Sequence, residues 1–216
     1  MGEKMKHISV MRDRCIDLLA PSIETSRTPV VVDATLGLGG HTEALLTRFP
    51  ELIVIGIDRD PSALLQARQR LSVFGDRLIT SHAVFDSITD VVTSHGYSQL
   101  SGVLFDLGVS SMQLDETDRG FSYSHDAPLD MRMDRSQTLS ADVIVNTYDE
   151  DALTSMLRRN ADERHAYRIA KAIIAARPIH STARLSDVVS SAIPAPARRR
   201  GGHPAKRTFQ AIRIEV

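Results

Sequence analysis

The chain has 216 residues, a single cysteine, and 26 basic residues that nearly balance 27 acidic ones. The length suffices for an α/β domain with an additional segment, and the balanced charge excludes a uniformly basic coat while permitting a local basic patch. Cys15 alone excludes an intramolecular disulfide and a cysteine-built zinc site. With no apolar run near the ~20 residues of a membrane span and no hydrophobic run after the first charges, we expect a cytoplasmic protein without a membrane partner.

The first half of the chain alternates between short apolar runs and segments with helical spacing of apolar residues. Ahead of the first run, an amphipathic helix is expected over 11–20, ending at Pro21 because proline disfavours a helix interior. Strands that alternate with helices predict an α/β fold with a parallel, doubly wound sheet. The expected strands are 30–32, 52–57, 77–80 and 101–105, and the expected helices are 42–49, 61–71 and 87–95.

A glycine-rich turn follows the first expected strand. Asp33 ends the apolar run Val30–Val32, and Gly37, Gly39 and Gly40 come before the next helix. Glycines let the backbone turn tightly and let a ligand approach main-chain N–H groups. Strand, glycine turn and helix form the first half of a nucleotide-binding βαβ unit, although a plain glycine-rich loop is the alternative on this pattern alone.

An acidic residue, Asp58, ends the second expected strand, 18 positions after Gly40 and close to the ~20 positions of a nucleotide-binding fingerprint. Such an acid can accept both hydroxyls of a ribose, in NAD as in S-adenosyl-L-methionine (SAM). A dinucleotide site has a third glycine under the pyrophosphate. Counting from Gly37 and Gly39, Thr42 stands at that position, and the pattern therefore favours SAM.

After Asp106 the alternation stops and helical patterns take over. A polar, turn-rich stretch at 113–135 is long enough to be either functional or disordered. Phe121, Tyr123, Met131 and Met133 argue against disorder because they give the stretch something to bury. Further helices are expected at 141–147, capped by Ser140, at 149–158, at 163–177 and from 181 or 182 to 193, and a last one from 205, after a linker-like stretch at 194–204.

Basic residues gather near the end of this otherwise neutral chain. A local patch of this kind suits phosphate groups, and a solvated run of charges is the alternative. The residues are Arg198, Arg199, Arg200, Lys206, Arg207 and Arg213.

Seven motifs in order make the chain resemble the MraW/RsmH-type 16S rRNA (cytosine-N4)-methyltransferases, which are SAM-dependent enzymes of the class I fold. Each motif is modest alone, and the order across nearly the whole chain is specific. The matching segments are His7–Val10, Asp33–His41, Asp58–Pro61, Phe105–Asp115, Gly120–Tyr123, Pro128–Asp134 and His203–Arg213.

The resemblance implies SAM as cofactor, methyl transfer to N4 of a cytidine, and 16S rRNA or the small ribosomal subunit as partner. No metal site is predicted, because no spacing of His41, His82, His95 and the Asp residues rises above chance; metal dependence and the oligomeric state stay open. The cofactor positions that carry over are Gly39, Gly40 and His41 in the first SAM loop, Asp58 at the ribose, Phe85 beside the adenine, Asp106 after the fourth strand, and Gln113.

Asp106 is also the predicted catalytic residue. The lone pair of an exocyclic amine is delocalised into the base, so transfer needs acceptors for the N4 hydrogens. We expect the Asp106 side chain or the backbone carbonyls that follow it to accept them. A role in fixing SAM alone is the open alternative.

Phe121, Tyr123 and Phe209 are candidates for stacking on single-stranded bases, with a place in the core as the alternative for each. In the family the chain continues past Val216 through a further sheet-forming segment with a Ser-Phe-His-Ser-Leu-Glu-Asp motif, and Met112 stands where proline is frequent. This chain therefore resembles a truncated member.

These observations predict a class I methyltransferase fold with a Rossmann-like parallel sheet and a helical insertion after strand four. The competing functions are a non-catalytic RNA-binding or assembly module and an NAD-dependent oxidoreductase. The expected domains are a SAM-binding core at 1–111, a mainly helical substrate-recognition insertion at 112–203, and a helix at 204–216 that returns towards the core.

Overall fold

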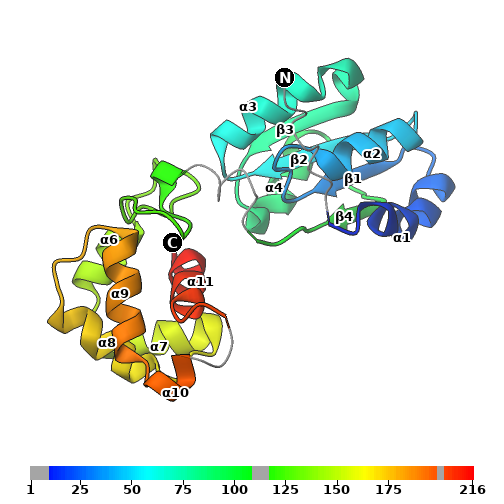
Figure 1. Ribbon diagram of the computed structural model, residues 1–216. Helices are drawn as coiled ribbons and strands as arrows, with labels where there is room; N and C mark the ends of the chain where they lie inside the picture. The colour runs from blue at the N-terminus through cyan, green and yellow to red at the C-terminus, as the bar shows by residue number, and fades with distance from the viewer. Residues whose placement is uncertain (1–9, 109–116, 199–201) are drawn as a thin grey trace, which may run out of the picture. The chain divides into compact units, whose positions relative to one another are not determined.

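The structure is a computed structural model that describes residues 10–108, 117–198 and 202–216 (Figure 1). By their internal contacts the residues divide into two compact units, Met1–Gly108 and Val109–Val216. We call them the sheet unit and the helical unit. The expected boundary at 111/112, like Met112 and Gln113, lies outside the described residues.

The sheet unit contains a four-stranded parallel sheet with the order β3-β2-β1-β4. The central strand, β1, is buried at all four positions, as its continuous β-branched run predicts for a strand covered on both faces. The predicted parallel, doubly wound α/β fold is thus confirmed. The strands are β1 (Val30–Asp33), β2 (Ile53–Asp58), β3 (Leu78–His82) and β4 (Gly102–Leu104).

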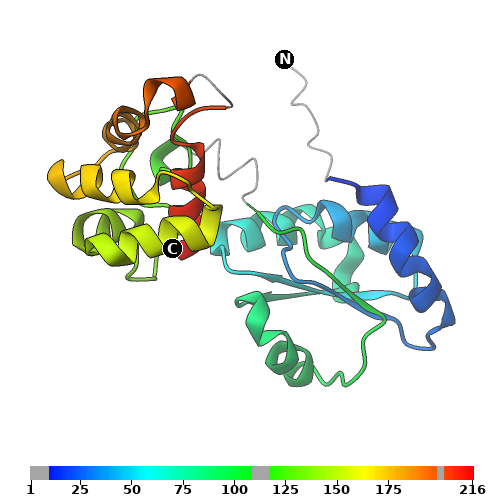
Figure 2. The ribbon, with the colours of Figure 1, turned by 90° about the horizontal axis from the view of Figure 1, so that it is seen from below.

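Helices cover both faces of this sheet (Figure 2). On one face α1 and α2 pack against Val31 and Val54, and on the other α4 packs against Val32 and Ile55. Since alternate residues of β1 and β2 point to opposite faces, the sheet contributes to two separate hydrophobic clusters. The helices are α1 (Arg12–Thr25), α2 (Gly40–Arg48), α3 (Pro61–Arg70) and α4 (Ile88–Ser94), with 3-10 turns η1 (Ser72–Arg77) and η2 (Phe85–Ser87).

The prediction that the first helix ends at Pro21 is wrong, because α1 continues through Pro21 to Thr25. A proline inside a helix removes one backbone donor, and its ring crowds the carbonyl of residue i−4. The buried residues Ile16, Ala20 and Ile23 lie on both sides of that position. Packing of this stripe against the sheet unit's core outweighs the lost hydrogen bond.

The described part of the helical unit begins with a 3-10 turn at Thr117–Arg119 and continues with helices at the predicted places. Ser140 and Ser181 cap two of them through their side-chain oxygens, which accept hydrogen bonds from the backbone N–H groups of Val143 and Arg184. These caps supply acceptors to otherwise unpaired donors of the first turn. The elements are η3 (Thr117–Arg119), α6 (Ala141–Thr147), α7 (Glu150–Ala161), α8 (Ala166–Ala175), α9 (Thr182–Ala192), α10 (Ala195–Arg198) and α11 (Lys206–Glu215).

A single hydrophobic cluster joins the described parts of the helical unit. The described part of the turn-rich stretch contributes Phe121 and Met131, each 1% exposed, which confirms that this part has apolar side chains to bury. The linker-like stretch at 194–204 contains a helix that was not predicted, α10. The helix of the predicted return segment, α11, packs against α7 within this unit.

Candidate functional site

The glycine turn after β1 has two residues in the left-handed region of backbone space. Gly37 has φ +51° and Gly39 has φ +76°, conformations that glycine adopts without steric cost. A Cβ on Gly39 would lie 2.5 Å from Leu71 Cδ1. The turn therefore requires glycine at this position both for its backbone conformation and for its packing on the end of α3, and Gly40 then opens α2.

Asp58, the predicted ribose acid, lies against this glycine turn. Its carboxylate accepts hydrogen bonds from the backbone N–H of Gly37 at 2.7 Å and of Asp60 at 2.9 Å. Burial raises the pKa of Asp58 above its ordinary 3.8, against the two backbone hydrogen bonds that lower it. The acid is partly exposed, so the charged carboxylate is held by main-chain donors and still accessible to a further donor.

Asp33, at the end of β1, is 1% exposed. It accepts hydrogen bonds from the Thr42 hydroxyl at 2.7 Å and from the Thr35 N–H at 3.3 Å. Burial raises the pKa of this carboxyl, and Thr42 and Thr35 partly oppose the rise. Thr35 was not among the predicted site residues, and the available signal for it was its position two residues after an acid at a strand end.

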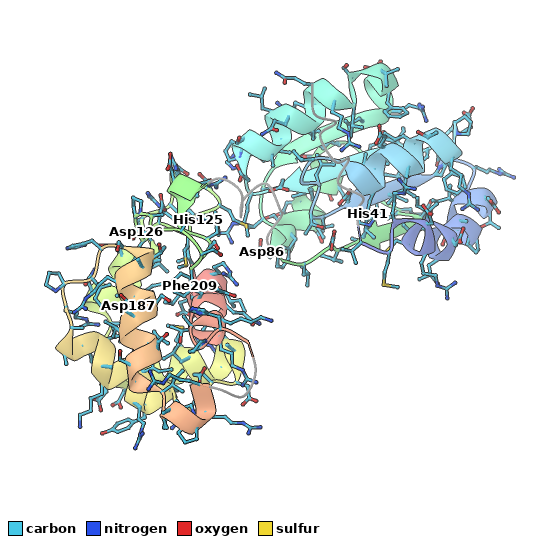
Figure 3. All side chains as sticks on the ribbon, in the orientation of Figure 1. His41, Asp86, His125, Asp126, Asp187 and Phe209 are labelled. Atoms are coloured by element: carbon cyan, nitrogen blue, oxygen red, sulfur yellow. The ribbon has the colours of Figure 1, made fainter. Side chains whose placement is uncertain are left out.

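Asp106 follows β4, and its backbone N–H donates to Thr35 Oγ1 at 2.7 Å. This bond ties the segment after β4 to the segment after β1. The Asp106 side chain is about half exposed, and its Oδ2 lies 3.9 Å from Nδ1 of His41. His41 itself, labelled in Figure 3, is 5% exposed near the start of α2, and its Nε2 lies 3.1 Å from the Val10 carbonyl oxygen. The structure thus brings together two predicted site residues from distant parts of the sequence.

Phe85, the predicted adenine-side residue, opens η2 after β3. Its ring is half exposed and meets the ring of Phe105 edge-to-face, with centroids 6.0 Å apart. Phe105 directly precedes Asp106 and is also about half exposed. Two accessible aromatic rings therefore lie beside the carboxyl edge of the sheet, where ligands bind in parallel α/β folds.

Of the two alternatives left open for Phe121 and Phe209, the structure supports a place in the core, because the two are 1% and 0% exposed in the cluster of the helical unit. Their aromatic rings could not be assigned to surface or core from residue type alone. Tyr123 is only partly buried, and its ring stacks on that of His203 with centroids 4.4 Å apart. It stays a candidate for a base contact.

The basic segment is only partly available for binding. Arg213 donates to the Phe121 carbonyl at 2.7 Å, and burial lowers the pKa of its guanidinium. Arg207 donates to the Asp162 carbonyl at 2.6 Å and is otherwise exposed. Arg198 and Lys206 are exposed, while Arg199 and Arg200 lie outside the described residues. The described part of the patch thus has three exposed cations.

Over 10–108, 117–198 and 202–216, no three His, Cys, Asp or Glu side chains gather as metal ligands would. In the same ranges no helix combines the length and apolar character needed to cross a bilayer.

Comparison with known proteins places this geometry in a family. A relative from Kocuria rhizophila is 56% identical over 99% of this chain and 66% of its own length, and one from Renibacterium salmoninarum is 56% identical over 98% and 66%. A third, from Salinispora arenicola, is 54% identical over the whole chain and 59% of its own length. All three carry the name ribosomal RNA small subunit methyltransferase H. The chain thus spans just under two thirds, or less, of these curated relatives.

The family model that describes MraW methylases matches residues 4–216. This match covers the glycine turn, Asp58, His41 and Asp106, so the residues at the carboxyl edge of the sheet belong to the region that the family shares. The chain is a member of the MraW methylase family.

Proposed function

We propose that the protein transfers a methyl group from SAM to N4 of a cytidine in 16S rRNA. The observation that carries the proposal is the meeting of the glycine turn, Asp58, His41 and Asp106 at one edge of a parallel sheet, in a chain more than half identical to proteins named small subunit rRNA methyltransferases.

The residues present fit SAM. Among the described residues, Asp58 accepts two backbone N–H groups at its two oxygens, and an ionised carboxylate has about four acceptor positions. Burial disfavours the charged form of the Asp58 carboxylate. Ribose hydroxyls would donate further hydrogen bonds to it and so stabilise that form. Phe85 offers an accessible ring for an adenine. We infer that Gly39, Gly40, His41 and Gln113 complete the binding site, as the family resemblance predicts.

A dinucleotide fits less well. A pyrophosphate packs over a glycine at the start of the helix, and here that position is Thr42, which is fully buried. Its hydroxyl is bound to Asp33. A further phosphate would have to displace this buried contact, and the NAD-dependent alternative is therefore disfavoured.

When bound, SAM supplies an electrophilic methyl group on a sulfonium. The task left to the chain is to orient the cytosine amine and to accept its hydrogens. Asp106 is suited to this, because its backbone is fixed by Thr35 while its carboxylate is half exposed. Holding the amine in line with the methyl supplies much of the rate, and the carboxylate receives the proton that N4 loses.

The partner in this proposal is the small ribosomal subunit, and its location is the cytoplasm. Exposed Arg198, Lys206 and Arg207 on the helical unit would contact RNA phosphates. Tyr123 would supply a stacking face. The helical unit thereby acts in substrate recognition.

The test begins with calorimetry of S-adenosylhomocysteine binding to the chain. We expect binding that weakens as pH falls through the pKa of Asp58, which lies above 3.8 in the free protein, because protonation removes an acceptor for the ribose. Asp58→Asn should weaken binding at neutral pH at least about tenfold and remove this pH dependence. No detectable binding would contradict the proposal.

Methylation is then measured with tritiated SAM and small ribosomal subunits, using this chain and a version extended to the length of its relatives. Asp106→Ala should abolish transfer, with Asp90→Ala on the exposed side of α4 as the control. Transfer at an undiminished rate by the Asp106 variant would show that this carboxylate is not the acceptor. Binding of cofactor without any methylation by either version would favour a non-catalytic RNA-binding module.

A further inference from the structure

Helix α8 has one buried side and one exposed side. Ile169 and Ile173 on the buried side are 0% and 1% exposed in the cluster of the helical unit. Residues three and four positions apart share one side of a helix. The exposed side therefore carries an aromatic residue and two cations, Tyr167, Arg168 and Lys171. Arg164, four positions before Arg168, adds an exposed cation at the turn that precedes the helix.

No acidic side chain balances these cations. The sequence from 164 to 184 contains neither Asp nor Glu. Among the described residues, no carboxylate forms an ion pair with Arg164, Arg168 or Lys171. The adjoining acid, Glu163, is 5% exposed, and its carboxylate accepts the backbone N–H of His165 at 2.9 Å. The described residues therefore leave the positive charge of this side of α8 without a counter-charge.

The placement of the cations does not stabilise the helix. The helix dipole favours acids in the first turn and cations in the last. Helix α7 follows this rule, with Glu150 and Asp151 in its first turn and basic residues in its last. Helix α8 has Arg168 in its first turn, no acid there and no basic residue in its last turn. Like charges at the 164/168 and 168/171 spacings also repel. An anionic partner would relieve both conflicts.

Tyr167 adds an accessible ring to this charged side. Its side chain is 49% exposed, and Nζ of Lys171 lies 5.7 Å from the centroid of its ring. Cations beside an exposed aromatic ring are the combination that binds single-stranded nucleic acid, because the cations contact phosphates and a base stacks on the ring. The ring therefore distinguishes this surface from a solvated run of charges.

The cations of α11 lie beside the start of this surface. The guanidinium of Arg207 donates to the Asp162 carbonyl at 2.6 Å, at the turn between α7 and α8. Arg207 and Lys206 are both exposed at the start of α11. The phosphate contacts proposed for these two residues can therefore continue along α8, over about 10 Å of helix from 164 to 171.

We propose that the exposed side of α8, formed by Arg164, Tyr167, Arg168 and Lys171, binds a single-stranded segment of RNA. The cations contact its phosphates and Tyr167 stacks on one of its bases. The inference rests on the proposed function, which makes RNA the partner of this chain. The helical unit then holds RNA along two helices, α8 and α11.

The charges are tested by filter binding of purified 16S rRNA to the chain over a range of KCl concentrations. Arg168→Gln/Lys171→Gln removes two positive charges and keeps good helix formers at both positions. We expect the affinity at physiological salt to fall about tenfold, and the slope of log affinity against log salt to become shallower by about 1 to 1.5. Unchanged binding would overturn the proposal.

The matched control is Arg14→Gln/Arg27→Gln, which removes the same charge from exposed positions of the sheet unit. This variant should bind 16S rRNA as the wild type does. An equal loss in the control and in the α8 variant would show that the overall charge alone sets the affinity, and the proposal would then be rejected.

Two variants of Tyr167 separate the ring from the charges. Tyr167→Leu should weaken 16S rRNA about tenfold, because a base loses its stacking partner, and the salt slope should stay unchanged. Tyr167→Phe keeps the ring and should bind as the wild type does. Equal affinity of the leucine variant and the wild type would contradict a base at this position.

A second pair of ligands separates this inference from the proposed function. S-adenosylhomocysteine should bind the α8 variants as it binds the wild type. A wild type that binds no 16S rRNA would reject the proposed function, whereas wild-type binding that the α8 variants retain in full would reject the inference alone. Phosphatidylserine vesicles test for a membrane surface instead. Vesicle binding that Arg168→Gln/Lys171→Gln loses while it keeps 16S rRNA would overturn the inference.

Discussion

The sheet unit and the helical unit hold their acidic residues in opposite ways. In the sheet unit, burial raises the pKa of Asp33 and Asp58, and the donors around them are backbone N–H groups and a hydroxyl. In the helical unit, burial also acts to raise the pKa of Asp130, but hydrogen bonds from Arg132 and the charges of Arg132 and Arg135 outweigh it, so the pKa is lowered.

The two units also differ in how they bury their apolar side chains. The sheet unit has separate clusters on its two faces and leaves Phe85 and Phe105 half exposed at the carboxyl edge. The helical unit collects its described apolar residues, including Phe121 and Phe209, in one cluster. Carboxyl groups with raised pKa values and exposed rings, as in the sheet unit, are typical of a ligand site. The helical unit buries Phe121 and Phe209, whose packing contributes to stability.

The largest expected effect comes from comparing two single variants, in each of which one phenylalanine is replaced by alanine. Phe209, labelled on α11 in Figure 3, is fully buried, and Phe209→Ala should lower the free energy of unfolding by about 3–5 kcal/mol. Phe85→Ala, at a half-exposed ring, should cost less than about 1 kcal/mol while weakening S-adenosylhomocysteine. Denaturant unfolding measures both. Equal losses of stability would erase the distinction between the two rings.

Replacing a glycine by alanine in each unit should give a smaller loss of stability, and we expect that loss to differ between the units. Gly120 has φ +68°, and a Cβ there would lie 2.2 Å from the Pro128 carbonyl oxygen. Because backbone cannot move aside, Gly120→Ala should cost about 2–3 kcal/mol. In the matched variant Gly39→Ala the close contact is with a side chain, 2.5 Å from Leu71 Cδ1, and not with backbone. This variant should also destabilise the fold, but by less. We expect the melting temperature of Gly120→Ala to be lower than that of Gly39→Ala. The reverse order would mean that the Leu71 side chain shifts less readily than the backbone of the 119–130 segment.

The smallest effect concerns Asp33 and Asp130, whose contributions to the stability of the fold change with pH in opposite directions. Asp33→Asn keeps both hydrogen bonds, because the amide oxygen accepts from Thr35 and the amide nitrogen donates to Thr42, and it removes a buried charge. The raised pKa of Asp33 means that protonation stabilises the fold fully below pH 3.8 and that this contribution is lost as pH rises through the folded pKa. At neutral pH the variant should therefore be more stable by about 1–2 kcal/mol.

Asp130→Asn should destabilise at neutral pH by about 1 kcal/mol, because it weakens charge-assisted hydrogen bonds to Arg132. The lowered pKa of Asp130 means that its contribution is present above pH 3.8 and is lost as pH falls through the folded pKa. Unfolding curves of both variants against wild type, from acid to neutral pH, should diverge in opposite directions. Parallel curves would show that the two carboxylates have similar environments.

Local chemistry in the sequence predicted most elements well. The β-branched run at Val30–Val32, the proline at the first position of α3 and the cap at Ser140 each act within a few residues of the chain. The prediction failed at Pro21, because the packing that carries α1 past the proline is tertiary. It also failed at α10, because so short a helix leaves no periodic pattern of apolar residues.

The site could be predicted only in part. Asp58 and the glycine turn follow from a spacing that the chain itself defines, and their contact is present. The resemblance placed both His41 and Asp106 at the cofactor, as a parallel sheet allows at the carboxyl ends of its strands. Their contact itself depends on β1 and β4 pairing side by side, which spacing along the chain does not encode. The burial of Phe209 depends on how α11 packs on α7, and an aromatic residue among basic ones suggested a surface instead.

The bond from the Gly37 N–H to Asp58 has a consequence for the kinetics of recognition. The turn is already in its folded conformation before a nucleoside arrives, because its own acid holds it there. A preorganised receptor avoids the entropy cost of ordering a loop during association. For the proposed ligand, differences in affinity among variants of this turn should therefore appear as changes in residence time, with the rate of association nearly constant.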